Sequence, residues 1–228
     1  MRKKRISILT GAGVSAESGI DTFRDSGGLW EKHAIEDVAT PEAWHRNRDL
    51  VMDFYNSRWA QLQTVEPNEA HRNLVKLEEK FQVKIITQNV DNLHERAGST
   101  HVLHLHGELS KCRSSGDERY IQDMPKHGLE PGMNCPKGHQ LRPHIVWFGE
   151  MVPALDEAIQ MVQETDILVV IGTSLNVYPA AGLAYAAPTE TEIFLIDPGD
   201  FAHTDTEGFE HIKKKASEGT RELLKKLL

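Results

Sequence analysis

The chain has 228 residues and 39% hydrophobic content, enough to bury one core plus an insertion but not two full domains. Its formal net charge of −8 argues against a general affinity for nucleic acid, which depends on clustered lysine and arginine. Residues 1–5 (MRKKR) are rich in basic side chains, but the apolar run that follows, residues 6–9, is too short for a signal peptide or a membrane span. Two cysteines are too few for a disulfide framework. We therefore expect a soluble cytoplasmic monomer that binds neither nucleic acid nor membranes.

A buried strand followed by a glycine-rich turn is predicted at the start of the chain. Arg5–Thr10 reads RISILT, which is typical of a strand in a parallel sheet. Gly11, Gly13 and Ala16 then fit the G-x-G-x-x-G/A pattern of dinucleotide binding, in which backbone N–H groups approach a pyrophosphate. The same residues also suit a plain tight turn between a strand and a helix.

The region after this turn lacks the features of a dehydrogenase. Such an enzyme would continue into a second strand, with an acidic residue about 20 positions on for the ribose. Here the chain enters a polar loop, Asp21–Trp30 (DTFRDSGGLW), with no strand pattern. Hydride transfer is therefore disfavoured.

The remaining elements alternate between strands and helices. Apolar runs predict further strands at Val83–Thr87, His101–Leu105, Asp166–Ile171 and Glu192–Ile196. Helical patterns span Asn68–Lys80, with Asn68 as N-cap, Pro153–Glu164 and Ser217–Leu227. This alternation predicts an α/β fold with a doubly wound parallel sheet.

Two stretches do not belong to this sheet and predict a smaller inserted module. Thr40–Gln63 is predicted to be one long amphipathic helix, opened by a Thr-Pro pair. Residues 110–140 are polar and irregular, rich in Gly, Pro, Ser and Lys. We expect the module to comprise residues 31–67 and 110–140, and the core to comprise residues 1–30, 68–109 and 141–228.

Polar residues follow three of the predicted strands, at the edge where such sheets bind ligands. The run TQNVDNLH (87–94) can hold a ribose and a carboxamide, although Asn89 or Asp91 could merely cap the next helix. Residues 172–174 (GTS) can bind phosphate or ribose hydroxyls, or simply turn the chain. His104 and His106 share one strand face, so an H-x-H metal pair is conceivable, and a structural histidine is the plainer alternative.

Five collinear motifs resemble the sirtuin family of NAD-dependent protein deacylases. They are GAGVSAESGI with TFR (11–24), TQNVDNLH (87–94), HLHGEL (104–109), LRPHIVWFGE (141–150) and GTS (172–174). The resemblance spans nearly the whole chain and implies a Rossmann-like core. The run at 23–44, followed by FYNSR (54–58), is most similar to the bacterial branch of the family that prefers acidic acyl groups.

The resemblance implies a cofactor site and a site for acylated-lysine peptides or proteins. NAD would be bound by Gly11, Ala12, Gly13, Ser15, Ile20, Phe23, Arg24, Gln88, Asn89, Asp91, Gly172, Thr173 and Ser174, with Asp197 and Ala216 on the adenosine side. The substrate would pair as an added strand with the segment of Val146, Phe148, Gly149 and Glu150, although that segment could also be a plain buried strand end.

The catalytic residues that the resemblance implies are His106 and Asn89. His106 would act as general base on a ribose hydroxyl, a task that suits an imidazole near neutral pH. The products would be free lysine, nicotinamide and O-acyl-ADP-ribose. An ADP-ribosyltransferase and an NAD-binding sensor remain alternatives, and a metal hydrolase built on His104 and His106 is a remote one because no carboxylate cluster completes its ligand set.

Tyr55 and Arg58 stand three apart on the predicted helix and share one face. The resemblance implies that they recognise the carboxylate of a succinyl or malonyl group, for which a guanidinium fork and a phenol are suitable donors. The alternative is a surface pair at helical spacing.

The chain departs from the family at the structural zinc, which usually lies on two Cys-x-x-Cys pairs. Ser114 and Asp117 stand where the first pair is expected, and the run CPKG (135–138) lacks the fourth ligand. A mixed site of Cys112, Cys135 and His139 with one carboxylate is an alternative. We expect a module without zinc.

Overall fold

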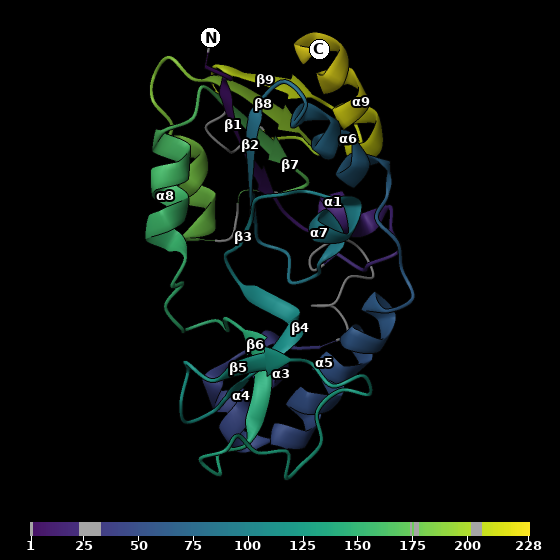
Figure 1. Ribbon diagram of the computed structural model, residues 1–228, viewed down its shortest axis with the longest axis vertical. Helices are drawn as coiled ribbons and strands as arrows, with labels where there is room; N and C mark the ends of the chain where they lie inside the picture. Colours follow the sequence, from purple (N-terminus) through teal and green to yellow (C-terminus); the bar gives the residue numbers. More distant parts are fainter. Residues whose placement is uncertain (1, 23–32, 174, 176–177, 202–206) are drawn as a thin grey trace.

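A six-stranded parallel sheet forms the larger of two units in the computed structural model, which describes residues 2–22, 33–173, 175, 178–201 and 207–228 (Figure 1). The strand order is β3-β2-β1-β7-β8-β9, and every neighbouring pair is parallel. The strands are β1 (Arg5–Thr10), β2 (Gln82–Thr87), β3 (Val102–His104), β7 (Ile167–Ile171), β8 (Glu192–Ile196) and β9 (Phe209–Ile212). After β1 the chain adds β2 and β3 on one side of it, and later adds β7, β8 and β9 on the other side. The point at which the strand order reverses, where folds of this kind bind ligands, therefore lies between β1 and β7.

Helices cover both faces of this sheet, which confirms the predicted doubly wound architecture. Alternate residues of β1 point to opposite faces: Ile8 packs with α6 (Glu69–Leu77) and α9 (Ala216–Leu227), and Leu9 packs with α8 (Leu155–Gln163) and the 3-10 helix η1 (Ala180–Tyr185). Figure 1 shows α8 on one side of the strands and α6 with α9 on the other. Two short helices, α1 (Gly13–Ala16) and α7 (Leu93–Ala97), follow β1 and β2. None of the described helices is both long enough and apolar enough to cross a bilayer.

The smaller unit combines an antiparallel sheet with helices. Its strand order is β5-β4-β6, and its helices are α3 (Ile35–Val38), α4 (Pro41–Arg46) and α5 (Arg48–Leu62). The strands are β4 (Gly107–Ser114), β5 (Ile121–Asp123) and β6 (Leu141–Ile145). One apolar cluster joins α5 to this sheet, with Val51, Met52, Leu109 and Trp147 among its buried members.

The single long helix predicted for Thr40–Gln63 is wrong, because the chain breaks at Asn47. Thr40 caps α4 as predicted, accepting a hydrogen bond from Ala43 N at 3.0 Å. Asn47 then leaves the helical region (φ −149°, ψ 79°), and its side chain accepts from Leu50 N at 3.2 Å to start α5. An asparagine side chain competes for backbone donors in this way, so it can end one helix and cap the next.

The expectation of an irregular segment at residues 110–140 is also wrong in part. Strand β4 continues to Ser114 and pairs with both β5 and β6. Because β6 belongs to the small sheet, the core resumes after residue 145 rather than at 141. His106 lies between β3 and β4, not on the strand that ends at His104.

Candidate active site

A cavity of about 960 Å³ opens at the carboxyl ends of the parallel strands and extends to the smaller unit. Its lining includes most of the positions singled out in the sequence: Gly11, Ala12, Gly13, Tyr55, Arg58, Gln88, Asn89, His106, Val146, Phe148, Gly149, Glu150, Gly172, Thr173, Asp197 and Ala216. Phe23, Arg24 and Ser174 lie outside the described residues. The structure thus brings together residues from eight separate parts of the sequence.

Glycines allow the turn after β1 and the turn after β7 to touch. Gly11 N donates to Ile171 O at 3.0 Å, and Gly13 N donates to Gly172 O at 2.9 Å. A Cβ on Gly13 would stand 2.6 Å from the Cα of Gly172, closer than side chains tolerate. The two glycine N–H groups are therefore occupied within the protein, and these glycines act by close backbone approach.

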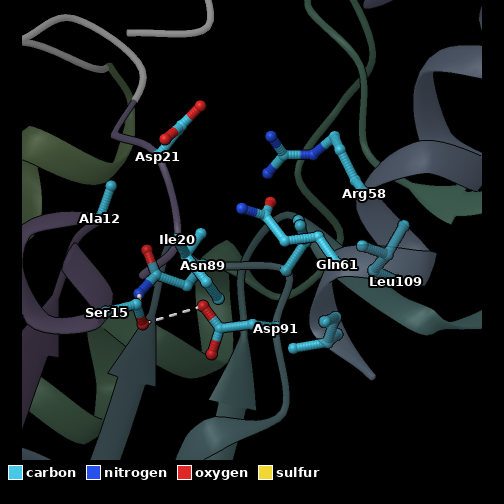
Figure 2. Close-up of a pocket in the computed structure, with 11 residues that line it drawn as sticks. Ala12, Ser15, Ile20, Asp21, Arg58, Gln61, Asn89, Asp91 and Leu109 are labelled. Atoms are coloured by element: carbon cyan, nitrogen blue, oxygen red, sulfur yellow. Dashed lines mark hydrogen bonds between the residues drawn. The ribbon is translucent and has the colours of Figure 1, made fainter. Parts of the chain in front are cut away.

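A buried hydrogen-bonded group of Ser15, Asn89 and Asp91 lies beside this turn (Figure 2). Ser15 Oγ donates to Asp91 Oδ2 at 2.9 Å, and Asn89 Nδ2 donates to Gly11 O at 3.1 Å. Burial raises the pKa of Asp91, and hydrogen bonds from Leu93 and Ser15 oppose the shift. Asp91 Oδ1 also accepts from Leu93 N at 3.1 Å, so this residue caps α7 as well as facing the pocket that Ile20 lines.

Asn89 is supported from behind by two threonines. Its backbone N donates to Thr87 Oγ1 at 3.0 Å, and Thr10 Oγ1 donates to the same oxygen at 2.9 Å. His94 Nε2 lies 3.1 Å from Thr10 Oγ1, and burial lowers the pKa of His94 well below its usual range. The imidazole of His94 is therefore neutral where it contacts Thr10, behind Asn89.

His106 faces the cavity in a defined tautomer. Its Nδ1 lies 3.0 Å from Gln88 O, and since a carbonyl only accepts, Nδ1 carries the proton. Burial lowers the pKa of His106, and the hydrogen bond to Gln88 partly opposes this. Nε2 of the neutral ring is therefore a proton acceptor.

His104 has a different environment. Its Nδ1 lies 3.1 Å from Asn89 O, and its Nε2 lies 2.7 Å from Glu95 Oε1. Burial alone would lower the pKa of His104, but the hydrogen bond and charge of Glu95 raise it overall. Both ring nitrogens are engaged, which leaves His104 none for a metal.

Tyr55 and Arg58 project from α5 into the cavity, so they are not a surface pair. Tyr55 is 4% exposed, and burial raises its pKa to about 12 against the opposing charge of Arg58. Burial also lowers the pKa of Arg58, opposed by Tyr55, Asp91 and Asp21, and a guanidinium remains charged in any case. Figure 2 shows the guanidinium extending toward the part of the pocket that carries Asp21.

Residues 146–150 follow β6 along the cavity. Val146 N donates to His106 O at 2.9 Å, and Phe148 N donates to Ala39 O at 3.0 Å. Glu150 accepts from Arg142 Nη1 at 2.7 Å and from Trp147 N at 2.8 Å, so its carboxylate fixes the segment.

The sequence did not single out Trp147, whose Nε1–H donates to the hydroxyl of Tyr55 at 3.0 Å. The two residues are far apart in the chain. The only available signal was the position of Trp147 within the run LRPHIVWFGE.

The positions at which the resemblance places zinc ligands hold a hydrogen bond and an ion pair. Ser114 Oγ donates to Cys135 Sγ at 3.3 Å, and Lys137 Nζ lies 2.5 Å from Asp117 Oδ2. Asp117 also lies 3.3 Å from Arg119 Nε. These contacts satisfy the polar atoms without a metal.

The mixed zinc site is not assembled either. Cys112 Sγ lies 3.6 Å from Asp123 O, and burial raises the pKa of this thiol to about 11, which disfavours the thiolate that binds zinc. Within the described ranges, no three His, Cys, Asp or Glu side chains are grouped to hold a metal ion. These residues do not fit a structural zinc.

Comparisons with known proteins agree with this geometry. Residues 11–179 match the model described as Sir2 family. An NAD-dependent protein deacylase of Bacteroides thetaiotaomicron is 51% identical over 230 residues, covering 99% of this chain and 98% of that protein. A solved Sir2 homologue in complex with NAD has a TM-score of 0.88 at 38% identity, covering 99% of this chain and 90% of that one. A Sir2 mutant with a deacetylated p53 peptide and 3′-O-acetyl-ADP-ribose has a TM-score of 0.85 at 28% identity, covering 98% of this chain and 94% of that one. The chain therefore belongs to the Sir2 family, the sirtuins.

Proposed function

We propose that this chain uses NAD to remove succinyl and malonyl groups, as well as acetyl groups, from lysine side chains of proteins. The observation that carries the proposal is that Tyr55 and Arg58 line the same cavity as His106. A guanidinium and a phenol are suitable donors for a carboxylate, whereas an acetyl group offers them no charged partner. NAD-dependent deacylation is the activity named for the relative with 51% identity, and the acidic preference rests on these two side chains.

The described residues fit NAD. The cavity of about 960 Å³ lies at the carboxyl ends of the parallel strands and is large enough for an extended dinucleotide, with Gly13 and Gly172 in its lining. NAD, when bound, supplies the ribose carbon that takes up the acyl oxygen as nicotinamide leaves. Ser15 would lie at the pyrophosphate, and Gln88, Asn89 and Asp91 would hold the nicotinamide half. The adenosine half would extend to Gly172, Thr173, Asp197 and Ala216.

His106 is the general base in this proposal. Gln88 O holds the proton on Nδ1, so that Nε2 accepts a proton from a ribose hydroxyl. Because burial lowers its pKa, the ring is in its accepting form at neutral pH. His104 would position the backbone of Asn89 through the bond to Asn89 O. The substrate peptide would pair with residues 146–149 by strand addition.

The test is mass spectrometry of matched acetyl-, succinyl- and malonyl-lysine peptides incubated with and without NAD. We expect NAD-dependent formation of free lysine, nicotinamide and O-acyl-ADP-ribose from all three. ADP-ribosylated peptide would instead support a transferase, and NAD binding without any reaction would support a sensor. NAD-independent, chelator-sensitive deacylation would contradict the proposal and support a metal hydrolase.

A further inference from the structure

The hydroxyl of Tyr55 receives a hydrogen bond from an unusual donor. Trp147 Nε1 lies 3.0 Å from Tyr55 Oη, and the two residues are 2% and 4% exposed. An indole N–H can only donate, so the phenol oxygen is the acceptor in this pair. The proton of Tyr55 must then point away from Trp147. Among the described residues the phenol makes no other hydrogen bond, and Tyr55 lines the cavity.

The indole is itself held in place. The Arg142 guanidinium carbon lies 3.3 Å from the centroid of the Trp147 ring, as in a cation–π contact. Arg142 Nη1 donates to Glu150 Oε1 at 2.7 Å, and Glu150 Oε2 accepts from Trp147 N at 2.8 Å. Helix α5 and strand β6 lie side by side in the smaller unit (Figure 1), and the Tyr55–Trp147 bond joins α5 to the segment that follows β6.

We propose that Trp147 is a positioning residue for acidic acyl groups: by donating to the oxygen of Tyr55, it directs the phenol O–H into the cavity, toward the carboxylate that Arg58 binds. This inference rests on the proposed function. Without the indole donor, the phenol can turn its proton toward Trp147 or the cavity, and its bond to the acyl carboxylate is less preorganised. An acetyl group has no carboxylate at this place, so the effect falls on succinyl and malonyl substrates.

The test measures kcat and KM for matched succinyl- and acetyl-lysine peptides with wild type, Trp147→Phe, Tyr55→Phe and the double variant. We expect Trp147→Phe to lower the succinyl-to-acetyl ratio of kcat/KM by about 3- to 10-fold, mainly through the KM for succinyl peptide. In the Tyr55→Phe background the same change should lower the ratio no further, because Trp147 acts through the phenol oxygen. Equal loss with both peptides, or the same drop in both backgrounds, overturns the inference.

Trp59→Phe is the matched control. Trp59 also lies on α5, and its Nε1 donates to Pro125 O at 2.9 Å, away from the cavity. It should leave the ratio unchanged, whereas a drop like that of Trp147→Phe would overturn the inference.

A second variant covers the case in which phenylalanine packs poorly at position 147. Replacing Trp147 by benzothienylalanine exchanges the N–H for a sulfur and keeps the two-ring shape, so it removes the donor alone. An unchanged ratio in this variant overturns the inference. Failure of the proposed function is seen separately, in the wild type. A wild-type enzyme that does not process succinyl peptide defeats both proposals. A wild-type enzyme that does process it, with Trp147 variants that keep the wild-type ratio, defeats only the role of Trp147.

Discussion

His71 makes the stability of this protein depend on pH. Its ring is fully buried, with Nδ1 accepting from Asn68 N at 3.3 Å and its centroid 4.8 Å from that of His94. Burial lowers the pKa of His71 from its ordinary 6.5 to about 4. The unfolded chain therefore takes up this proton at higher pH than the folded chain does. The stability linked to the neutral ring is fully present above pH 6.5 and is lost as the pH falls toward 4.

The size of this effect follows from the two pKa values. Between pH 7.5 and pH 5, His71 alone should lower the free energy of unfolding by about 2 kcal/mol. The assay is urea unfolding of wild type and His71→Gln at both pH values. Glutamine is a suitable replacement because it also completes a capping box at the third helical position. We expect the acid-induced loss to be about 2 kcal/mol smaller in the variant. Equal losses in the two proteins would refute the reasoning.

Three further predictions concern the base, the glycine turn and the small module. His106→Ala should lower deacylation about 100- to 10,000-fold while calorimetry still detects NAD binding, and a parallel loss of NAD affinity would indicate a structural histidine. Gly13→Ala, whose Cβ would stand 2.6 Å from the Cα of Gly172, should lower the free energy of unfolding by about 1–3 kcal/mol. Gly182→Ala, where a Cβ meets no described atom within 4 Å, should cost less, and equal losses would contradict the steric argument. Elemental analysis should find no stoichiometric zinc in the purified protein, with a Tm that a chelator does not change; stoichiometric zinc would contradict the account of Ser114 and Cys135.

The parallel sheet could be predicted because its strands are continuous apolar runs. Strands such as β7 are buried along their whole length and carry a signal that needs no partner. Strand β9 (FEHI) and strand β5 (IQD) are too short and too polar for periodicity to identify them. Strand β9 belongs to the large sheet and β5 to the small one, whose other strands, β4 (GELSKCRS) and β6 (LRPHI), are also rich in polar residues, so the small sheet was missed. The break at Asn47 was missed because a side-chain cap interrupts a helical pattern only locally.

The candidate site could be predicted as far as each residue follows a strand or belongs to a motif. His106, Asn89 and Asp91 were identified in this way, and they lie around the cavities. Contacts between distant segments could not be predicted, since they depend on tertiary packing. The bond from Trp147 to Tyr55 is one example, and the edge-to-face contact of His71 with His94 is another.

The most direct test of the acidic-acyl assignment is the ratio of kcat/KM for succinyl- and acetyl-lysine peptides in wild type and Arg58→Met. Methionine keeps most of the length of the side chain and removes its charge and its donors. A charge-assisted hydrogen bond contributes about 1.5–3 kcal/mol, so the ratio should fall by roughly 10- to 150-fold. The account predicts that wild type processes succinyl peptide at least as well as acetyl peptide and that Arg58→Met loses this preference. Parallel loss of both activities, or a wild type that ignores succinyl peptide, would contradict it.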